Sequence, residues 1–182
     1  MINYEKKSLF DVQGKVILVH AANCQGVMGA GIASEFKKRF PEAVALYEYD
    51  FRKTGQLTGM SPSAGTAKIY KTNNPDIFMG CLFTSWNYGK FVDHPDAIVT
   101  YTQHALKKFL RQTQAMPNFK IYSNKFNSGL FHVPWEKTEE LIKTELLKYP
   151  SVVWTICDLN LPQSPNGRIL CSQPNDTGLT PV

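Results

Sequence analysis

The sequence has few of the features that indicate export, a membrane span or a bound metal. No apolar run approaches the roughly 20 residues that cross a bilayer, and the start of the chain, MINYEKKSLFDV, has no apolar signal core. The cysteines show neither CxxC spacing nor a zinc-type pattern with histidine: Cys24, Cys81, Cys157 and Cys171. We therefore expect reduced thiols in a cytoplasmic or nuclear protein, with no metal, no cofactor and no membrane partner.

The excess of positive charge is modest. The formal net charge is +5 and the isoelectric point is near 9.0. The basic residues at 37–39 and 107–111 fit the solvated faces of two helices, and no basic stripe with interleaved aromatics is present. The net charge weakly favours an anionic small molecule as partner, and the absence of such a stripe argues against nucleic acid. The sequence does not determine the oligomeric state, and we expect a monomer.

Segments with the pattern of buried strands alternate along the chain with segments that have helical periodicity. Strands are predicted at 16–20, 66–70, 76–85, 119–123 and 151–157, with an additional edge strand within 2–10. Helices are predicted from about residue 30 to 40 and after Pro41, Pro95 and Pro134. This alternation predicts an α/β domain with a mostly parallel sheet and helices on both faces.

The chain length of 182 residues fits one domain. Residues 1–159 carry the alternating pattern, and 54–65 is a loop rich in Gly, Ser and Pro. Residues 160–182 are polar, rich in Pro and Gly, and without a period. We expect them to form a tail that is flexible or lies as a strap over the domain.

Three loops of unusual composition each follow a predicted strand: 21–31, 85–94 and 124–134. Because the carboxyl ends of parallel strands meet at one edge of a sheet, these loops are predicted to gather there. Ligands of open α/β sheets bind at that edge. This convergence is the main argument from the residues themselves for a binding site.

The loop NCQGVMGAGIA at 23–33 holds three glycines between a predicted strand and a predicted helix. Glycines allow positive φ, and the backbone N–H groups of such a loop and of a helix N-terminus can bind an anion. The loop lacks the lysine of a Walker A motif and the GxGxxG spacing of a dinucleotide site. Taken alone, it fits a phosphate site and a structural turn equally well.

The loop NSGLFHVPW at 127–135 is a second candidate for phosphate binding. Ser128 and Gly129 can present backbone N–H groups to a phosphate, and Phe131 can lie against a ribose or a base. The alternative is that Phe131 and Trp135 are core aromatics next to a helix. Two such loops at one sheet edge suit a ligand that contains a pyrophosphate.

Longer strings around these loops resemble a known family. HAANCQGVMGAGIASEFKKRFP resembles the first signature of macrodomains, ADP-ribose-binding modules with an Asn-x-x-Gly-x-x-Gly-x-Gly core, and NSGLFHVPWEKT resembles their second. CLFTSWNYGK followed by DAIVTYTQHALKKF is similar to one branch, the fungal-type ADP-ribose 1''-phosphate phosphatases. The resemblance spans residues 4 to 158. It implies a three-layer α/β/α sandwich with a mixed, mostly parallel central sheet.

The resemblance also implies roles for individual residues. His20 matches the catalytic histidine of the phosphatase branch, and Asn23 would hold the hydroxyls of the distal ribose. Substrate-binding residues would be Gly26, Gly29, Ala30, Gly31 and Ile32 in the first loop, and Ser128, Gly129, Leu130 and Phe131 in the second. The acid that many macrodomains carry after their first strand is missing, since the matching place falls near Ser8.

The implied reaction is hydrolysis of the 1''-phosphate of ADP-ribose 1''-phosphate, a by-product of tRNA splicing, to ADP-ribose and inorganic phosphate, without a metal. His20 can accept a proton, donate one or attack phosphorus, and the alternative is a buried structural histidine. His132 is a weaker candidate with a surface or structural alternative. Asp93 and His94 fit helix capping. Nothing near Cys24 indicates a reactive thiolate.

Three other functions stay open. A hydrolase that removes ADP-ribose from protein side chains would carry an acid in a Gly-Leu-Asp string, where this chain has Phe131. A module that only binds ADP-ribose would need the same two loops and no catalytic group. An unrelated nucleotide-binding α/β domain is disfavoured by the missing Walker lysine.

Overall fold

The structure is a computed structural model that describes residues 1–52 and 62–162. Most of the predicted loop at 54–65 and of the predicted tail at 160–182 lies outside these residues. The division of the chain at residue 159 therefore stays a prediction.

The described residues form six strands, four α-helices and two 3-10 helices in an alternating order. The strands are β1 (Ile2–Glu5), β2 (Val16–Asn23), β3 (Thr66–Lys71), β4 (Ile77–Ser85), β5 (Lys120–Ser123) and β6 (Trp154–Cys157). The α-helices are α1 (Gly31–Arg39), α2 (Pro41–Arg52), α3 (Pro95–Thr113) and α4 (Trp135–Leu146), and the 3-10 helices are η1 (Leu9–Asp11) and η3 (Gly89–Phe91). All the predicted strands and helices are present.

The strands form one mixed sheet in the order β1-β6-β5-β2-β4-β3. Every neighbouring pair is parallel except β3 and β4, which are antiparallel. The fold class is the predicted α/β sandwich, and the continuous apolar run of β2 suits its central place between β5 and β4.

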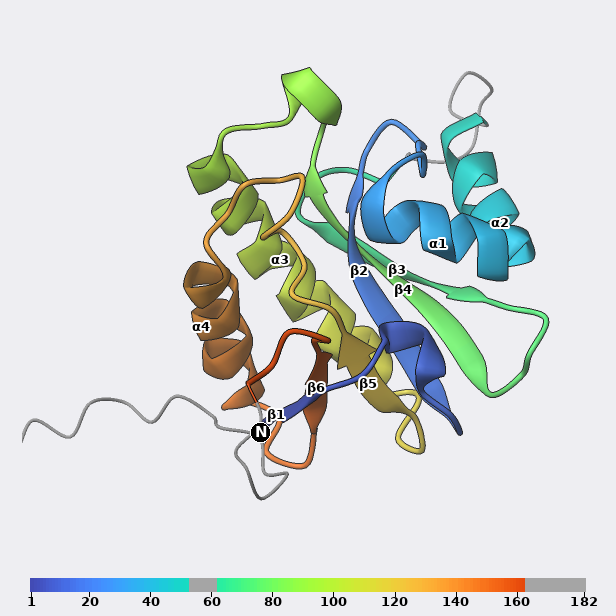
Figure 1. Ribbon diagram of the computed structural model, residues 1–182, viewed down its shortest axis with the longest axis vertical. Helices are drawn as coiled ribbons and strands as arrows, with labels where there is room; N and C mark the ends of the chain where they lie inside the picture. Colours follow the sequence, from blue (N-terminus) through green and yellow to red (C-terminus); the bar gives the residue numbers. More distant parts are fainter. Residues whose placement is uncertain (53–61, 163–182) are drawn as a thin grey trace, which may run out of the picture.

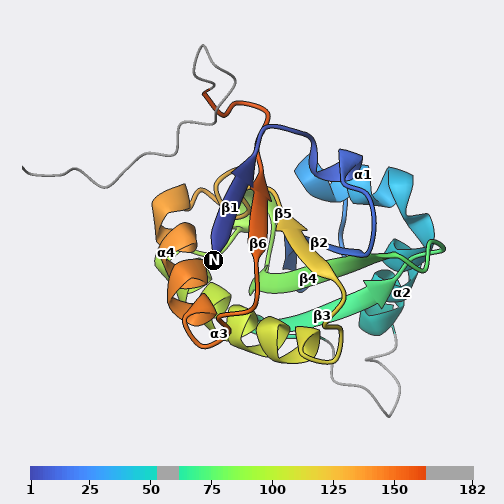
Figure 2. The same cartoon turned by 90° about the horizontal axis from the view of Figure 1, so that it is seen from below.

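Helices cover both faces of the sheet (Figures 1 and 2). On one face, Leu18 of β2 packs in a core cluster with Phe36 of α1 and Tyr47 of α2. On the other, Val19 of β2 packs in a second cluster with residues of α3 and α4. Because neighbouring strand residues point to opposite faces, β2 contributes to both clusters.

Two predicted strand boundaries, one in β2 and one in β6, were wrong by three residues, and the first one matters for the site. β2 does not end at His20 but continues to Asn23, because its pairing with β4 extends to Asn23 opposite Ser85, past an irregularity after Ala22. His20 is therefore an internal residue of the strand, and the loop begins at Cys24. β6 is shorter than predicted and begins at Trp154.

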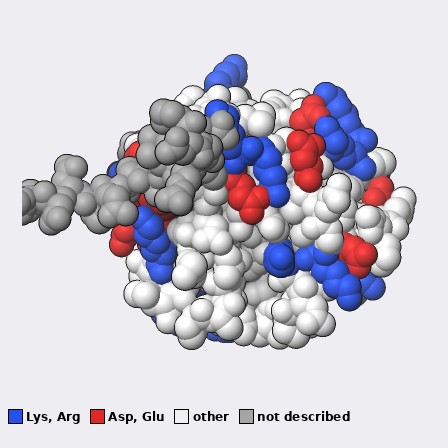
Figure 3. Space-filling view, turned by 60° about the horizontal axis from the view of Figure 1, so that its bottom comes forward, with Lys and Arg blue, Asp and Glu red and all other residues white. Residues whose placement is uncertain are grey.

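Basic and acidic side chains lie beside one another on the face shown in Figure 3 and form no stripe of one sign. Ion pairs among the described residues include Lys37 with Glu48 at 2.9 Å and Lys68 with Asp50 at 2.7 Å. Within residues 1–52 and 62–162, no helix has the length and apolar character that a membrane crossing requires.

Candidate functional site

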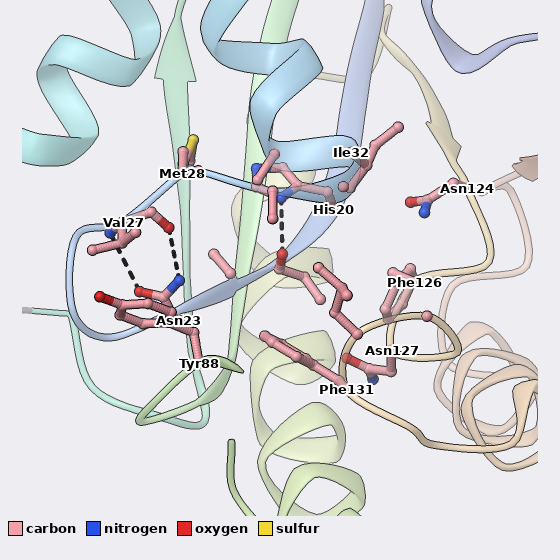
Figure 4. A pocket seen from close by; sticks show the side chains of 18 of the residues that line it. His20, Asn23, Val27, Met28, Ile32, Tyr88, Asn124, Phe126, Asn127 and Phe131 are labelled. Carbon is pink, nitrogen blue, oxygen red and sulfur yellow. Dashed lines mark hydrogen bonds between the residues drawn. The ribbon is translucent and has the colours of Figure 1, made fainter. Parts of the chain in front are cut away.

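The three loops border one cavity of about 620 Å³ at the carboxyl ends of β2 and β5 (Figure 4). This confirms that residues from the three predicted loops come together. The first segment contributes His20 to Asn23 and Val27 to Ala33, the second contributes Tyr88 and Gly89, and the third contributes Asn124 to Asn127 and Gly129 to His132. A cavity of this size falls in the range of small-molecule sites.

Asn23 organises the glycine loop from inside. Its Nδ2 donates to the carbonyl oxygen of Val27 at 2.7 Å, and its Oδ1 accepts from the N–H groups of Gln25 at 3.0 Å and Val27 at 3.3 Å (Figure 4). The Tyr47 hydroxyl donates to the backbone oxygen of Asn23 at 3.1 Å. An amide nitrogen carries two hydrogens, so one stays available to a ligand.

The N-terminus of α1 faces the same cavity. Gly29, Ala30 and Gly31 line it, and the N-cap residue Ala30 provides no side-chain hydrogen bond. The first N–H groups of a helix have no partner within the helix, and the helix dipole adds partial positive charge there. Gly31 has φ +55, the left-handed region that glycine adopts without strain.

The second loop brings further N–H groups to the cavity. Among the hydrogen bonds of the described residues, none uses the N–H of Gly129, Leu130 or Phe131 as donor. A turn holds these residues, with the His132 N–H donating to the carbonyl of Gly129 at 3.0 Å. Asn127 fixes the start of the loop through bonds from its amide to Thr102 and from Thr84 to its oxygen, both at 2.8 Å.

The cavity is therefore lined by two sets of N–H groups without protein partners, one from each loop. Successive backbone N–H groups that converge on one space bind anions, above all phosphates. The only basic side chain in the described lining apart from histidine is Lys125, which pairs with Asp158 at 2.7 Å. Anion binding here thus rests on the backbone more than on charged side chains.

His20 lies in the wall of the cavity, and its side chain is fully buried. Its ring stacks on Phe36 with centroids 4.5 Å apart, Nδ1 lies 2.9 Å from the carbonyl oxygen of Ala21, and Nε2 lies 3.4 Å from Sγ of Cys81. Burial lowers the pKa of His20 to about 4, against a raising effect of the Ala21 bond. The imidazole is neutral at pH 7, with Nδ1 as donor to Ala21.

The other candidates of the sequence analysis have distinct places. His132 is exposed and lines the cavity, with φ 56. The ring of His94 caps α3 by accepting from the Asp96 N–H at 3.3 Å, as predicted. Asp93 does not cap the helix; its carboxylate accepts from the Trp86 N–H at 2.6 Å and closes that loop. Burial and the nearby Asp93 raise the pKa of Cys24 to about 12, so its thiol stays protonated.

The cavity lining includes nine of the predicted site residues: His20, Asn23, Gly29, Ala30, Gly31, Ile32, Gly129, Leu130 and Phe131. Gly26 and Ser128 are outside it. Gly26 has φ +70 and packs so closely that a Cβ would come 3.0 Å from Phe51. Ser128 uses its hydroxyl to donate to the carbonyl of Lys125 at 2.5 Å. Both positions shape the loops from outside the cavity.

Sequence reasoning missed several lining residues, among them Met28, Tyr88, Asn124 and Asn127. Tyr88 lies in the predicted loop 85–94. The position of that loop after a strand was therefore the only sequence signal for it. Ser8, at the place of the missing acid, is not among the lining residues; its hydroxyl oxygen accepts from the Phe10 N–H at 3.2 Å. In the described part of the chain, no cluster of His, Cys, Asp and Glu could hold a metal ion.

Comparison with known proteins gives consistent matches. The family model described as Macro domain matches residues 19–142, which include the whole described lining of the cavity. Two proteins named ADP-ribose 1''-phosphate phosphatase are similar: one from Candida albicans, 34% identical over 79% of this chain and 92% of its own, and one from Scheffersomyces stipitis, 36% identical over 70% and 82%. Among solved structures, the macrodomain of Mycobacterium tuberculosis DarG has a TM-score of 0.69 at 24% identity, covering 86% of this chain and 97% of that one.

Proposed function

Since the chain belongs to the macrodomain family, we propose that its cavity binds ADP-ribose and that the protein hydrolyses the 1''-phosphate of ADP-ribose 1''-phosphate. The observation that carries this proposal is the pair of loops whose free N–H groups border one cavity. The names of the similar fungal proteins support the substrate. The substrate would reach the protein as a by-product of tRNA splicing, in the cytoplasm or the nucleus.

The two loops suit a diphosphate flanked by two sugars. In this arrangement, the N-terminus of α1 and the backbone of 129–131 donate hydrogen bonds to the phosphate oxygens. The free hydrogen on Nδ2 of Asn23 donates to the distal ribose. Such preorganised donors stabilise the charge that develops on phosphoryl oxygens in the transition state.

The reaction needs one water and one group that carries a proton. The water oxygen attacks phosphorus and loses a proton to a neutral imidazole, the bond between phosphorus and the 1'' oxygen breaks, and the 1'' oxygen takes that proton, which gives ADP-ribose and inorganic phosphate. We propose His20 as the acid–base group, in line with the family resemblance. Its burial sets a condition: Nε2 has to leave Cys81 and reach the bound phosphate. His132 is the second imidazole of the cavity and is exposed without any rearrangement.

Two related functions use the same cavity. A module that only binds ADP-ribose would use the same N–H groups but would release no phosphate. A hydrolase for ADP-ribosylated side chains that relies on an acid in the second loop is disfavoured, because Phe131 occupies that place.

Release of inorganic phosphate from ADP-ribose 1''-phosphate tests the proposal directly, with ADP-ribose binding measured by calorimetry on the same preparation. We expect both. Binding without phosphate release would assign the protein to the binding modules. Absence of both would overturn the proposed function.

A further inference from the structure

A polar atom in the wall of the cavity has no partner. Oδ1 of Asn124 is shielded from solvent, and no group in the described residues donates a hydrogen bond to it. Asn124 lines the cavity, and in Figure 4 its oxygen points toward the side where Ile32 lies. Buried acceptors are almost always paired, and leaving one unpaired costs stability. Because this oxygen has no exposed surface, a ligand donor meets it only after the amide turns toward the cavity, and a ligand that supplies such a donor would stabilise the turned side chain.

The backbone holds Asn124 in a defined position. It directly follows β5, whose last residue, Ser123, pairs with Val19 of β2 and Ile156 of β6. The carbonyl oxygen of Asn124 accepts from the Phe126 N–H at 2.9 Å, which turns the chain into the second loop. A side chain that projects from the end of a paired strand is better fixed than one in the middle of a loop.

Asn124 and Asn23 lie at opposite ends of the cavity. Asn23 ends β2 opposite Ser85 of β4, whereas Asn124 follows β5, which lies on the other side of β2. In Figure 4, Asn23 and Val27 lie on one side of the cavity and Asn124 on the other. In the same view, Ile32 of the first loop and Phe131 of the second are labelled between them (Figure 4). A diphosphate bound to those loops would direct the adenosine toward one end of the cavity and the distal ribose toward the other.

We propose that Oδ1 of Asn124 accepts a hydrogen bond from the exocyclic amine of adenine and so selects the base of the ligand. This inference rests on the proposed function, which assigns the distal ribose to the Asn23 end and leaves the Asn124 end for the adenosine half. In adenosine the amine is the only donor of the base, because its unsubstituted ring nitrogens are acceptors. Ile32 and Phe126, which line the same cavity and are labelled on the same side of Figure 4 as Asn124, are apolar, as suits a flat base.

The test is a cycle of protein and ligand variants followed by calorimetry. The ligands are ADP-ribose and its analogue with unsubstituted purine, in which hydrogen replaces the amine. This analogue has neither donor nor acceptor at that position, so a rotated amide cannot compensate. The variants are Asn124→Leu, which removes the acceptor at similar volume, and Asn124→Asp, which keeps it. Asn73→Leu, exposed in the turn between β3 and β4, is the control.

We expect the unchanged protein and the Asn73→Leu control to prefer ADP-ribose over the purine analogue by about threefold to tenfold, the value of one neutral hydrogen bond. Asn124→Leu loses this preference. Asn124→Asp keeps it, even if the negative charge lowers the affinity for both ligands. Non-additivity of the two changes identifies direct contact. Thermal unfolding verifies that each variant is folded.

Two results would overturn the assignment while leaving the proposed function intact. One is an unchanged preference in Asn124→Leu. The other is an equal loss of affinity for both ligands in that variant. In that case Oδ1 would accept from a donor that both ligands carry, such as a ribose hydroxyl. Failure of the unchanged protein to bind either ligand would instead overturn the proposed function itself.

Discussion

The Thr84 hydroxyl donates a hydrogen bond of 2.8 Å to Oδ1 of Asn127 and so ties β4 to the loop that follows β5. Nδ2 of the same amide donates to Thr102 on α3 at 2.8 Å. Asn127 is buried and has φ 66, a conformation that Asn adopts more readily than most residues. One side chain thus fixes the second loop to the sheet and to a helix.

We expect Asn127→Ala to lower the free energy of unfolding by about 2–4 kcal/mol, because it leaves two buried hydroxyls without this partner and strains the backbone. Urea denaturation measures the effect. Ser128→Ala is the control: Ser128 is exposed, and its loss should cost about 0.5 kcal/mol or less. Equal losses in the two variants would contradict the anchoring role of Asn127.

A pair of glycines in the first loop gives a matched test of backbone conformation. Gly31 has φ +55, and a Cβ there would come 3.3 Å from Cδ1 of Leu130 in the second loop. Gly29 has no positive φ, and its Cβ would meet no atom closer than 3.8 Å. We expect Gly31→Ala to cost about 1–2 kcal/mol and to weaken ADP-ribose binding, while Gly29→Ala stays within about 0.5 kcal/mol in stability. Similar stability of the two variants would speak against strain at Gly31.

The buried imidazole of His20 makes stability depend on pH. Its pKa is about 4 in the folded protein, below the ordinary 6.5, so protonation favours the unfolded chain. The stabilisation is fully present above pH 6.5 and is lost as the pH falls toward 4. The total is on the order of 3 kcal/mol, of which about 2 kcal/mol is lost at pH 5. Urea denaturation between pH 7.5 and 4 measures this.

The contribution of His20 is separated from that of the carboxylates by a variant without the titrating ring. His20→Gln removes the charge change, whatever its effect on absolute stability. The difference between the two pH profiles should slope between pH 6.5 and 4. Parallel profiles would mean that the pKa of His20 is the same in the folded and the unfolded chain.

The fold was largely predictable because its signals are local. The apolar run of β2 and the prolines that open α2 and α3 fix the elements, and alternation of strands and helices fixes the class. The predicted ends of strands were wrong where hydrogen bonding to a neighbouring strand determines the end. The sequence VILVH predicts a strand end at His20, but pairing with β4 carries β2 on to Asn23 and thereby buries the histidine.

The site was predictable to the level of its loops but not of all its residues. Glycine spacing indicates which backbone approaches a ligand, and nine predicted residues do line the cavity. Gly26 and Ser128 belong to the same motifs yet serve the turns, and that distinction depends on φ and on packing against Phe51. Asn124 carries no motif at all, because its importance arises from an oxygen left without a partner by the folded chain.

The acid–base assignment is tested by two variants of cavity-lining imidazoles. We expect His20→Ala to retain ADP-ribose binding and to lower kcat for phosphate release by about a hundredfold or more, the usual contribution of proton transfer. His132→Ala, which removes the exposed imidazole of the same cavity, should keep kcat within about threefold if His20 alone transfers the proton. Because a neutral imidazole accepts the proton and the pKa of His20 is about 4, the enzyme's own contribution to kcat/KM should stay level down to about pH 5 and fall below that, beside the titration of the substrate phosphate at about pH 6. Loss of turnover in His132→Ala, together with full turnover in His20→Ala, would transfer the role to His132 and make His20 a packing residue beneath the cavity.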